Sequence, residues 1–224
     1  MKKLKSVLLI LLAIITVSSC SGIKVTDSWK ADDVGSIKEE NILVIVRTDD
    51  MVSRQRFEQE IANKIREGGN KATESYKKFP GMKHNVKRTE EEIEQLIQII
   101  KNEGFGGIVL TVLKDMSTEI VTSETGGYTA GGYYPSYYGG YYGGFGGYYG
   151  RVYSPYGYGY GGTYVPSETR TYTSETYKLE TVIYNLDFDK GKQLIAVVSV
   201  DITDPSSASK VAPKYAEAVA KALK

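Results

Sequence analysis

The stretch at residues 42–46, ILVIV, is wholly apolar and mostly β-branched. A half-buried strand alternates apolar and polar side chains, whereas a short continuous apolar run is typical of a strand covered on both faces. Residues 108–113, IVLTVL, have the same character. The fold must therefore place other elements on both sides of the sheet that contains these two strands.

An amphipathic helix is predicted between them, directly after the first strand. Ser53 is its candidate N-cap, and residues 68–69, a Gly-Gly pair, end it because glycine adopts the left-handed conformation cheaply. Its apolar stripe repeats one turn at a time, at Phe57, Ile61 and Ile65. Residues 71–76 then form a shorter, more polar strand, which we expect at a sheet edge.

A second helix is predicted before residues 108–113. Thr89 and Glu92 form a capping-box signature, and an i, i+3, i+4, i+7 stripe follows at Ile93, Leu96, Ile97 and Ile100. The first half thus reads β-α-β-α-β, which implies parallel strands joined by right-handed crossovers. Because the most apolar strand should be central, we expect the order 2-1-3.

The second half alternates polar and apolar side chains. Residues 117–125 and 167–180 are predicted to be two arms of a long antiparallel hairpin. Core-type strands follow at residues 181–186 and 193–200, and Pro213 is placed in the first turn of a C-terminal helix. The sequence therefore predicts an α/β fold with one mixed sheet in the order 2-1-3-4-5.

Residues 126–164 break this pattern, because 15 of the 39 positions are Gly and 14 are Tyr. Without aliphatic residues such a segment builds no core, so residues 126–166 are expected to form a flexible loop at the hairpin tip. Its paired tyrosines are candidates for partner contact: Tyr133, Tyr134, Tyr137, Tyr138, Tyr141, Tyr142, Tyr148 and Tyr149. A neutral low-complexity expansion is the alternative. A membrane-inserted hairpin is disfavoured, since each Tyr pair puts one ring on each face.

The N-terminus has a basic start followed by an apolar run at residues 7–15 and the sequence VSSC, ending at the single cysteine, Cys20. The run is too short to cross a membrane, and the order of charged, apolar and small residues is that of a secretory signal. The pattern resembles a bacterial lipobox, which implies cleavage before Cys20 and lipidation of that residue. An ordinary signal peptide with a chance cysteine is the alternative.

This interpretation divides the chain into a signal peptide (residues 1–19), a tether (20–40), and one α/β domain (41–125 and 167–224). Trp29, within the tether, is expected to pack on the domain's edge. No acidic residue stands directly after Cys20, where Ser21 and Gly22 follow, which favours anchoring in the outer membrane facing the periplasm.

The net charge of the mature chain argues against a nucleic-acid partner. Removing residues 1–19 takes away three of the 28 Lys and Arg and none of the 27 Asp and Glu, which leaves a net charge of −2. The lipid anchor would supply the attachment to the membrane, because the charge does not.

The chain offers few groups for catalysis. His84 is the only histidine and lies in a polar loop stretch, and no GxSxG motif is present. Residues 104–107, GFGG, follow a helix and precede a strand, so they are expected to be a turn and not a phosphate loop. Asp49 and Asp50 follow the first strand, where ligands often bind. Complementation of the helix dipole is their preferred interpretation.

We therefore expect a non-enzymatic envelope binding or accessory protein without a metal or cofactor, whose partner is an envelope protein or a glycan. The alternatives are a glycan- or peptidoglycan-associated structural lipoprotein, and a hydrolase that uses His84.

The first helix and the strand after it carry a family resemblance. The motif consists of Arg56-Phe57-Glu58, Gly69, Ala72, Ser75-Tyr76 and Pro80. It resembles a group of uncharacterised Gram-negative, Bacteroidota-like envelope lipoproteins with a small α/β domain. The resemblance covers residues 25–115 and, more loosely, 180–223. It implies a fold and a location in the cell envelope, but no activity. Arg56 and Glu58 are expected to form either a binding pair or a surface ion pair.

Overall fold

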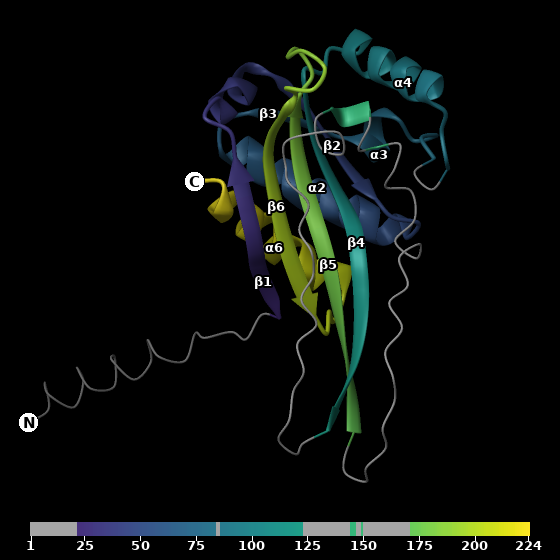
Figure 1. The fold of residues 1–224 in the computed structure, drawn as a ribbon, viewed down its shortest axis with the longest axis vertical. Coiled ribbons are helices and arrows are strands. Elements are labelled where there is room, and N and C mark those ends of the chain that lie inside the picture. The colour runs from purple at the N-terminus through teal and green to yellow at the C-terminus, as the bar shows by residue number, and fades with distance from the viewer. Residues whose placement is uncertain (1–21, 84–85, 123–143, 147–148, 150–170) are drawn as a thin grey trace, which may run out of the picture.

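The computed structural model describes residues 22–83, 86–122, 144–146, 149 and 171–224. Six strands form one open, mixed sheet in the order β1-β6-β5-β4-β2-β3 (Figure 1). The strands are β1 (Ile23–Lys30), β2 (Asn41–Arg47), β3 (Lys71–Glu74), β4 (Gly107–Thr122), β5 (Thr171–Asn185) and β6 (Leu194–Thr203). The described helices are α2 (Met51–Glu67), α3 (Ser75–Lys78), α4 (Glu90–Asn102), α6 (Ala208–Ala222) and a 3-10 helix, η2 (Val34–Glu39). The predicted α/β class and mixed sheet are confirmed.

Helices cover the two faces of the sheet. β2 is parallel to both β3 and β4. The pairs β4–β5, β5–β6 and β1–β6 are antiparallel. Alternate residues of β2 enter different cores: Val44 and Val46 join a cluster with α2 and α6, and Leu43 and Ile45 join a cluster with α4. Both faces of β2 are therefore buried, as its continuous apolar run predicts.

The prediction that residues 20–40 form a tether is wrong, because Ile23–Lys30 is the edge strand β1. The five-strand order 2-1-3-4-5 consequently differs from the observed order, which has this sixth strand beside β6. Burial alternates regularly along β1, but a charged residue, Asp27, occupies one of the half-buried positions, so the sequence does not show a clear apolar alternation. Trp29 packs against the apolar cluster on the α4 side, as expected of an edge anchor.

The helix starts are confirmed in part. Thr89 and Glu92 form the predicted capping box of α4. The N-cap of α2 is Asp50 and not Ser53, because the Asp50 side chain accepts a hydrogen bond from the Val52 N–H at 3.0 Å. The helix α6 begins at Ala208, so Pro213 lies inside the helix and not in its first turn.

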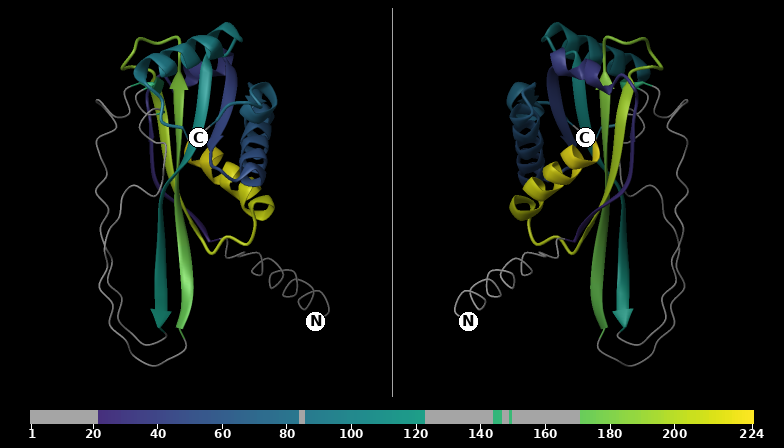
Figure 2. Two further views of the ribbon diagram at one scale, coloured as in Figure 1. Left: turned by 90° about the vertical axis from the view of Figure 1, so that its right-hand side faces the viewer. Right: turned by 90° about the vertical axis from the view of Figure 1, so that its left-hand side faces the viewer.

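The predicted long hairpin is present. β4 and β5 pair from Gly107↔Asn185 to Thr122↔Thr171, with a register shift between Leu113 and Asp115. The two side views show α2 and α6 on one side of the sheet, and the hairpin extending beyond both helices (Figure 2). The upper half of the hairpin therefore belongs to the core, and the lower half projects from it.

Part of the Gly/Tyr-rich segment belongs to the core, so the prediction that it makes no core contacts is wrong at two positions. Phe145 and Tyr149 have relative exposures of 0% and 1%. The Phe145 ring lies 5.8 Å from that of Tyr184 on β5, and a Cβ at Gly146 would touch Ile93 and Ile97 of α4. Aromatic rings supply buried apolar area without any aliphatic residue, which the composition argument overlooked.

Candidate ligand-binding pocket

A pocket of about 410 Å³ lies between the sheet and the N-terminal ends of α2 and α6. Its walls come from six elements, β2, α2, β4, β5, β6 and α6, and from the residues that connect them. They comprise Val46, Arg47, Thr48, Asp50, Ser53, Phe57, Thr111, Val112, Leu113, Tyr177, Leu179, Ile202, Pro205, Ser207, Ala208 and Val211. A volume of this size suits a small molecule or a single chain of a larger one.

The topology explains why the pocket forms here. From β2 the chain runs through α2 to β3 on one side, then through α4 to β4 on the other side of β2. The two connections leave in opposite directions, which opens a crevice where β2 ends beside β4. Thr48 follows the carboxyl end of β2, and Leu113 follows Val112, the last residue of β4 that pairs with β2, so the pocket occupies the switch point of the sheet.

The inner walls of the pocket are apolar. Phe57 of α2, Ile202 of β6 and Val211 of α6 are buried, whereas Leu113 and Leu179 of the hairpin are partly exposed beside them. Partly exposed aliphatic side chains facing a cavity keep apolar surface in contact with water. A ligand with an apolar body would remove that contact.

Thr111, which lines the pocket, belongs to a group of buried hydroxyls that satisfy one another. The Thr111 and Thr181 hydroxyl oxygens lie 2.8 Å apart, and Thr181 Oγ1 lies 2.7 Å from the Tyr215 hydroxyl. Burial raises the pKa of Tyr215 above its usual range, so this phenol stays protonated and remains a hydrogen-bond partner. Thr111 therefore presents a hydroxyl to the pocket whose hydrogen bond is already made within the core.

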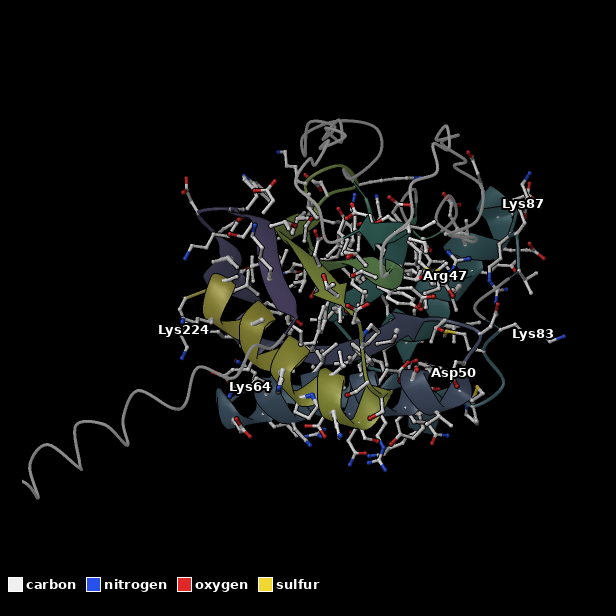
Figure 3. The ribbon with its side chains drawn as sticks, turned by 90° about the horizontal axis from the view of Figure 1, so that it is seen from below. Arg47, Asp50, Lys64, Lys83, Lys87 and Lys224 are labelled. Carbon is white, nitrogen blue, oxygen red and sulfur yellow. The ribbon has the colours of Figure 1, made fainter. Side chains whose placement is uncertain are left out.

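The rim of the pocket carries a carboxylate. Asp50 Oδ2 accepts a hydrogen bond from the Ser53 hydroxyl at 2.6 Å, and Oδ1 accepts from the Val52 N–H. These two donors lower the pKa of Asp50, so it stays ionised. Seen from below, Arg47 and Asp50 lie on the same side of the domain as Lys83 and on the opposite side from Lys224 (Figure 3). Asp50 lies at the N-terminus of α2, where its charge complements the helix dipole as expected, and the same side chain also lies at the pocket rim.

A buried ionic network lies behind the pocket. Glu58 is fully buried; its Oε1 accepts hydrogen bonds from the Val46 N–H (3.0 Å), Arg54 Nε (3.1 Å) and the Ser75 hydroxyl (2.7 Å). Its Oε2 accepts one from the Tyr76 N–H at 2.8 Å. These bonds tie α2 to β2 and to the start of α3. They hold the α2 side of the pocket in place.

The expected pairing of Arg56 with Glu58 is therefore wrong. Arg56 is exposed, whereas Arg54 is 1% exposed and pairs with Glu58 one helical turn away. A spacing of two residues puts side chains on different sides of a helix, and a spacing of four puts them on the same side. The motif residues Glu58 and Ser75-Tyr76 come together in the fold and serve the packing of the domain.

One of the tyrosines predicted to contact a partner is instead part of the interior. The guanidinium of Arg47 lies 4.8 Å from the centre of the Tyr149 ring and donates a hydrogen bond to the Tyr149 carbonyl oxygen. Tyr149 is 1% exposed, so the prediction of partner contact is wrong for this residue. The favourable contact of a cation with an aromatic face explains its position.

The other predicted site residues lie outside the described residues. They are Cys20, His84 and seven of the paired tyrosines: Tyr133, Tyr134, Tyr137, Tyr138, Tyr141, Tyr142 and Tyr148. Within the described ranges, no three His, Cys, Asp or Glu side chains come close enough to hold a metal ion, and no helix is long and apolar enough to cross a membrane.

Sequence reasoning missed most of the pocket. Its lining comes from residues 46–57, 111–113, 177–179 and 202–211, which pairing and packing bring together only in the folded chain. One signal was present, since Asp50 follows a buried strand at the edge where open α/β sheets bind ligands.

Known proteins offer little direct guidance. No family model matches the chain, and no curated protein matches it in sequence. Among solved structures, a PelC dodecamer from Paraburkholderia phytofirmans has a TM-score of 0.39 at 9% identity, covering 89% of this chain and 95% of that one. A variant PelC dodecamer from the same organism has a TM-score of 0.40 at 9% identity, covering 89% of this chain and 97% of that one.

Proposed function

We propose that the protein is a lipid-anchored binding or accessory protein of the bacterial outer membrane, facing the periplasm, and that the pocket between α2 and α6 is its ligand site. The observation that carries this proposal is the largely apolar pocket of about 410 Å³ beside the carboxyl end of β2 and the middle of β4. Pockets of this kind, with apolar walls and a few polar groups, are the usual form of small-molecule sites.

The groups around the pocket support binding over catalysis. The Thr111 hydroxyl in the pocket wall is hydrogen-bonded to Thr181 in the core behind it, and the Asp50 carboxylate caps α2. Groups held in this way can orient a ligand, because their own geometry does not change when it enters. A binding role therefore requires nothing beyond the apolar walls and the polar rim.

The anchor part of the proposal depends on VSSC, which resembles a lipobox. Cells would be fed an alkyne-bearing fatty acid, and the protein would be isolated and tested for label. We expect label on the wild type and its loss in Cys20→Ser, with the wild type sedimenting with outer membranes. Equal labelling of the two proteins would contradict lipidation at this residue.

The pocket part calls for a variant that fills the cavity without disturbing the core. Ala208 is a half-buried lining residue in the first turn of α6, so Ala208→Trp would occupy the mouth. Lys210, two positions on and exposed, provides the matched control Lys210→Trp. Equal thermal unfolding temperatures would show that both variants fold.

Each full-length protein would be extracted from membranes in polymer nanodiscs, without detergent, and its bound small molecules identified by mass spectrometry. We expect one class of molecule to accompany the wild type and Lys210→Trp but not Ala208→Trp. Identical extracts from all three would contradict a ligand in this pocket.

A further inference from the structure

The chain enters the domain beside the pocket. The Thr203 N–H donates a hydrogen bond to the Gly22 carbonyl oxygen at 2.6 Å, which joins the start of the described chain to the end of β6. The next residue, Ile23, pairs with Ile202, and Ile202 lines the pocket. Figure 1 shows that β1 begins at the end of the sheet toward which the β4–β5 hairpin extends.

Only Ser21 separates Gly22 from Cys20. Two residues of extended chain span at most about 7 Å, so a lipid on Cys20 would be attached close to the end of β6. With that lipid in the bilayer, the end of the domain that carries Ile202, Pro205 and Ser207 would face the head groups. The pocket would then lie next to a reservoir of acyl chains.

We propose that the pocket binds one acyl chain of a phospholipid whose head group carries an ammonium, taken from the leaflet that holds the anchor. This inference rests on the proposed function, because it needs both the lipid on Cys20 and a ligand in the pocket. It adds the chemical class of the ligand and the direction from which it enters.

The apolar walls favour an acyl chain as the occupant. An acyl methylene group finds a similar apolar environment in the bilayer and between Phe57, Leu179 and Val211. Moving the acyl chain from the bilayer into the pocket therefore costs little free energy. The gain comes from the pocket, because the chain displaces water from the partly exposed side chains of Leu113 and Leu179. A polar ligand such as a sugar would leave its hydroxyls unpaired against these walls.

The rim selects the head group. Asp50 is exposed and ionised, held in place by Ser53 and Val52. It would repel the carboxylate of a free fatty acid and attract an ammonium group. Because Asp50 is solvent-exposed, the selection should be modest and should weaken as the salt concentration rises.

The test uses the full-length lipidated protein in nanodiscs doped with phosphatidylethanolamine that carries a diazirine in the middle of one acyl chain. After illumination, crosslinked peptides are mapped by mass spectrometry. We expect crosslinks at residues 177–179 and 202–211 in the wild type. These crosslinks should fall at least fivefold in Ala208→Trp and stay unchanged in Lys210→Trp. Crosslinks confined to the exposed hairpin side chains Met116 and Ile120 would overturn the proposal.

A second arm tests the head group with a diazirine-bearing palmitate in the same nanodiscs. Asn caps helices as well as Asp does, so Asp50→Asn should fold normally while removing the charge. We expect the wild type to crosslink the phospholipid more than the fatty acid, and Asp50→Asn to raise fatty-acid crosslinking several-fold. Equal crosslinking of both probes by both proteins would overturn the assigned head group.

Failure of this inference is distinguishable from failure of the proposed function. A co-purified small molecule without an acyl chain, lost only in Ala208→Trp, would overturn the lipid ligand and leave the pocket as a binding site. Label that persists in Cys20→Ser would instead overturn the anchor.

Discussion

Arg54 Nε and Glu58 Oε1 form an ion pair of 3.1 Å in which both side chains are almost completely buried. The carboxylate also accepts hydrogen bonds from the backbone of β2 and of α3, so a single side chain joins three elements. Because the β2 end of this network is Val46, which lines the pocket, the pair links the packing of the domain to the shape of its candidate site.

Replacing Glu58 by Gln should lower the free energy of unfolding by about 3–5 kcal/mol, because it leaves the Arg54 charge buried without a counter-charge. Chemical denaturation monitored by circular dichroism would measure the change. Arg56→Gln is the matched control on the same helix; since Arg56 is exposed, the change should stay within about 0.5 kcal/mol. Equal effects of the two substitutions would show that the ion pair is not the buried one described.

Glu74 should make the stability of the domain depend on pH in the acid range. Burial by itself raises the pKa of Glu74, but hydrogen bonds from Arg66 and Lys77 outweigh it and hold the pKa below the usual 4.5. A carboxyl group with a lowered pKa stabilises the fold above its unfolded-state pKa, and this contribution is lost as the pH falls through the folded-state value.

Glu74→Gln should therefore be less stable than the wild type at pH 7, by about 1 kcal/mol because both partners are partly exposed. The difference should shrink as the pH falls below 4.5. Urea denaturation at pH 7, 5, 4 and 3 would follow it. A difference that stays constant over this range would contradict the role of the charge.

The Gly/Tyr-rich segment should contribute to stability through Phe145. Truncation to Ala should cost about 3–5 kcal/mol, because the ring is buried against Tyr184 and Tyr149. Ile120→Ala provides a control, since Ile120 is 59% exposed and should change stability by less than about 0.5 kcal/mol. Thermal unfolding of both variants would decide whether this segment is needed for folding.

Tyr149 offers a sharper test of the same contact. Its hydroxyl is buried and has no hydrogen-bond partner among the described residues. Tyr149→Phe removes an unsatisfied polar group while keeping the ring beside Arg47, so stability should be unchanged or slightly higher. A loss of more than about 1 kcal/mol would show that the hydroxyl makes a bond.

Asp204 should stabilise the domain in two ways, through its backbone conformation and through its carboxylate. Its φ of 48° lies in the left-handed region. Its side chain accepts hydrogen bonds from the Glu175 N–H at 2.8 Å and the Ser174 hydroxyl at 3.1 Å. Asp204→Ala should cost about 2 kcal/mol, from roughly 1 for the strained backbone and 1 for the lost bonds.

Asp204→Asn should cost less than half as much, because Asn tolerates the left-handed conformation and keeps an acceptor oxygen. Denaturation midpoints of the two variants would be compared under one condition. Equal losses would mean that the charge, and not the backbone conformation or the acceptor, accounts for the effect.

The sequence by itself determined the local elements, because their signals lie within a few residues. The apolar run at residues 42–46 specifies a strand buried on both faces, and Thr89 and Glu92 mark the start of α4 through bonds that they make to each other. The long hairpin was also evident from alternation. VSSC, ending at Cys20, is likewise a local signal, and its role remains a prediction.

Only the tertiary structure decided how these elements meet. β1 is held at the edge of the sheet by backbone hydrogen bonds to β6, which depend little on the side chains. Its polar sequence therefore resembles that of a tether. Glu58 and Ser75 meet across two elements, and Tyr149 is buried beneath Arg47 from 102 positions away. The pocket follows the same rule, because its walls come from strands and helices that are neighbours in space and not in the chain.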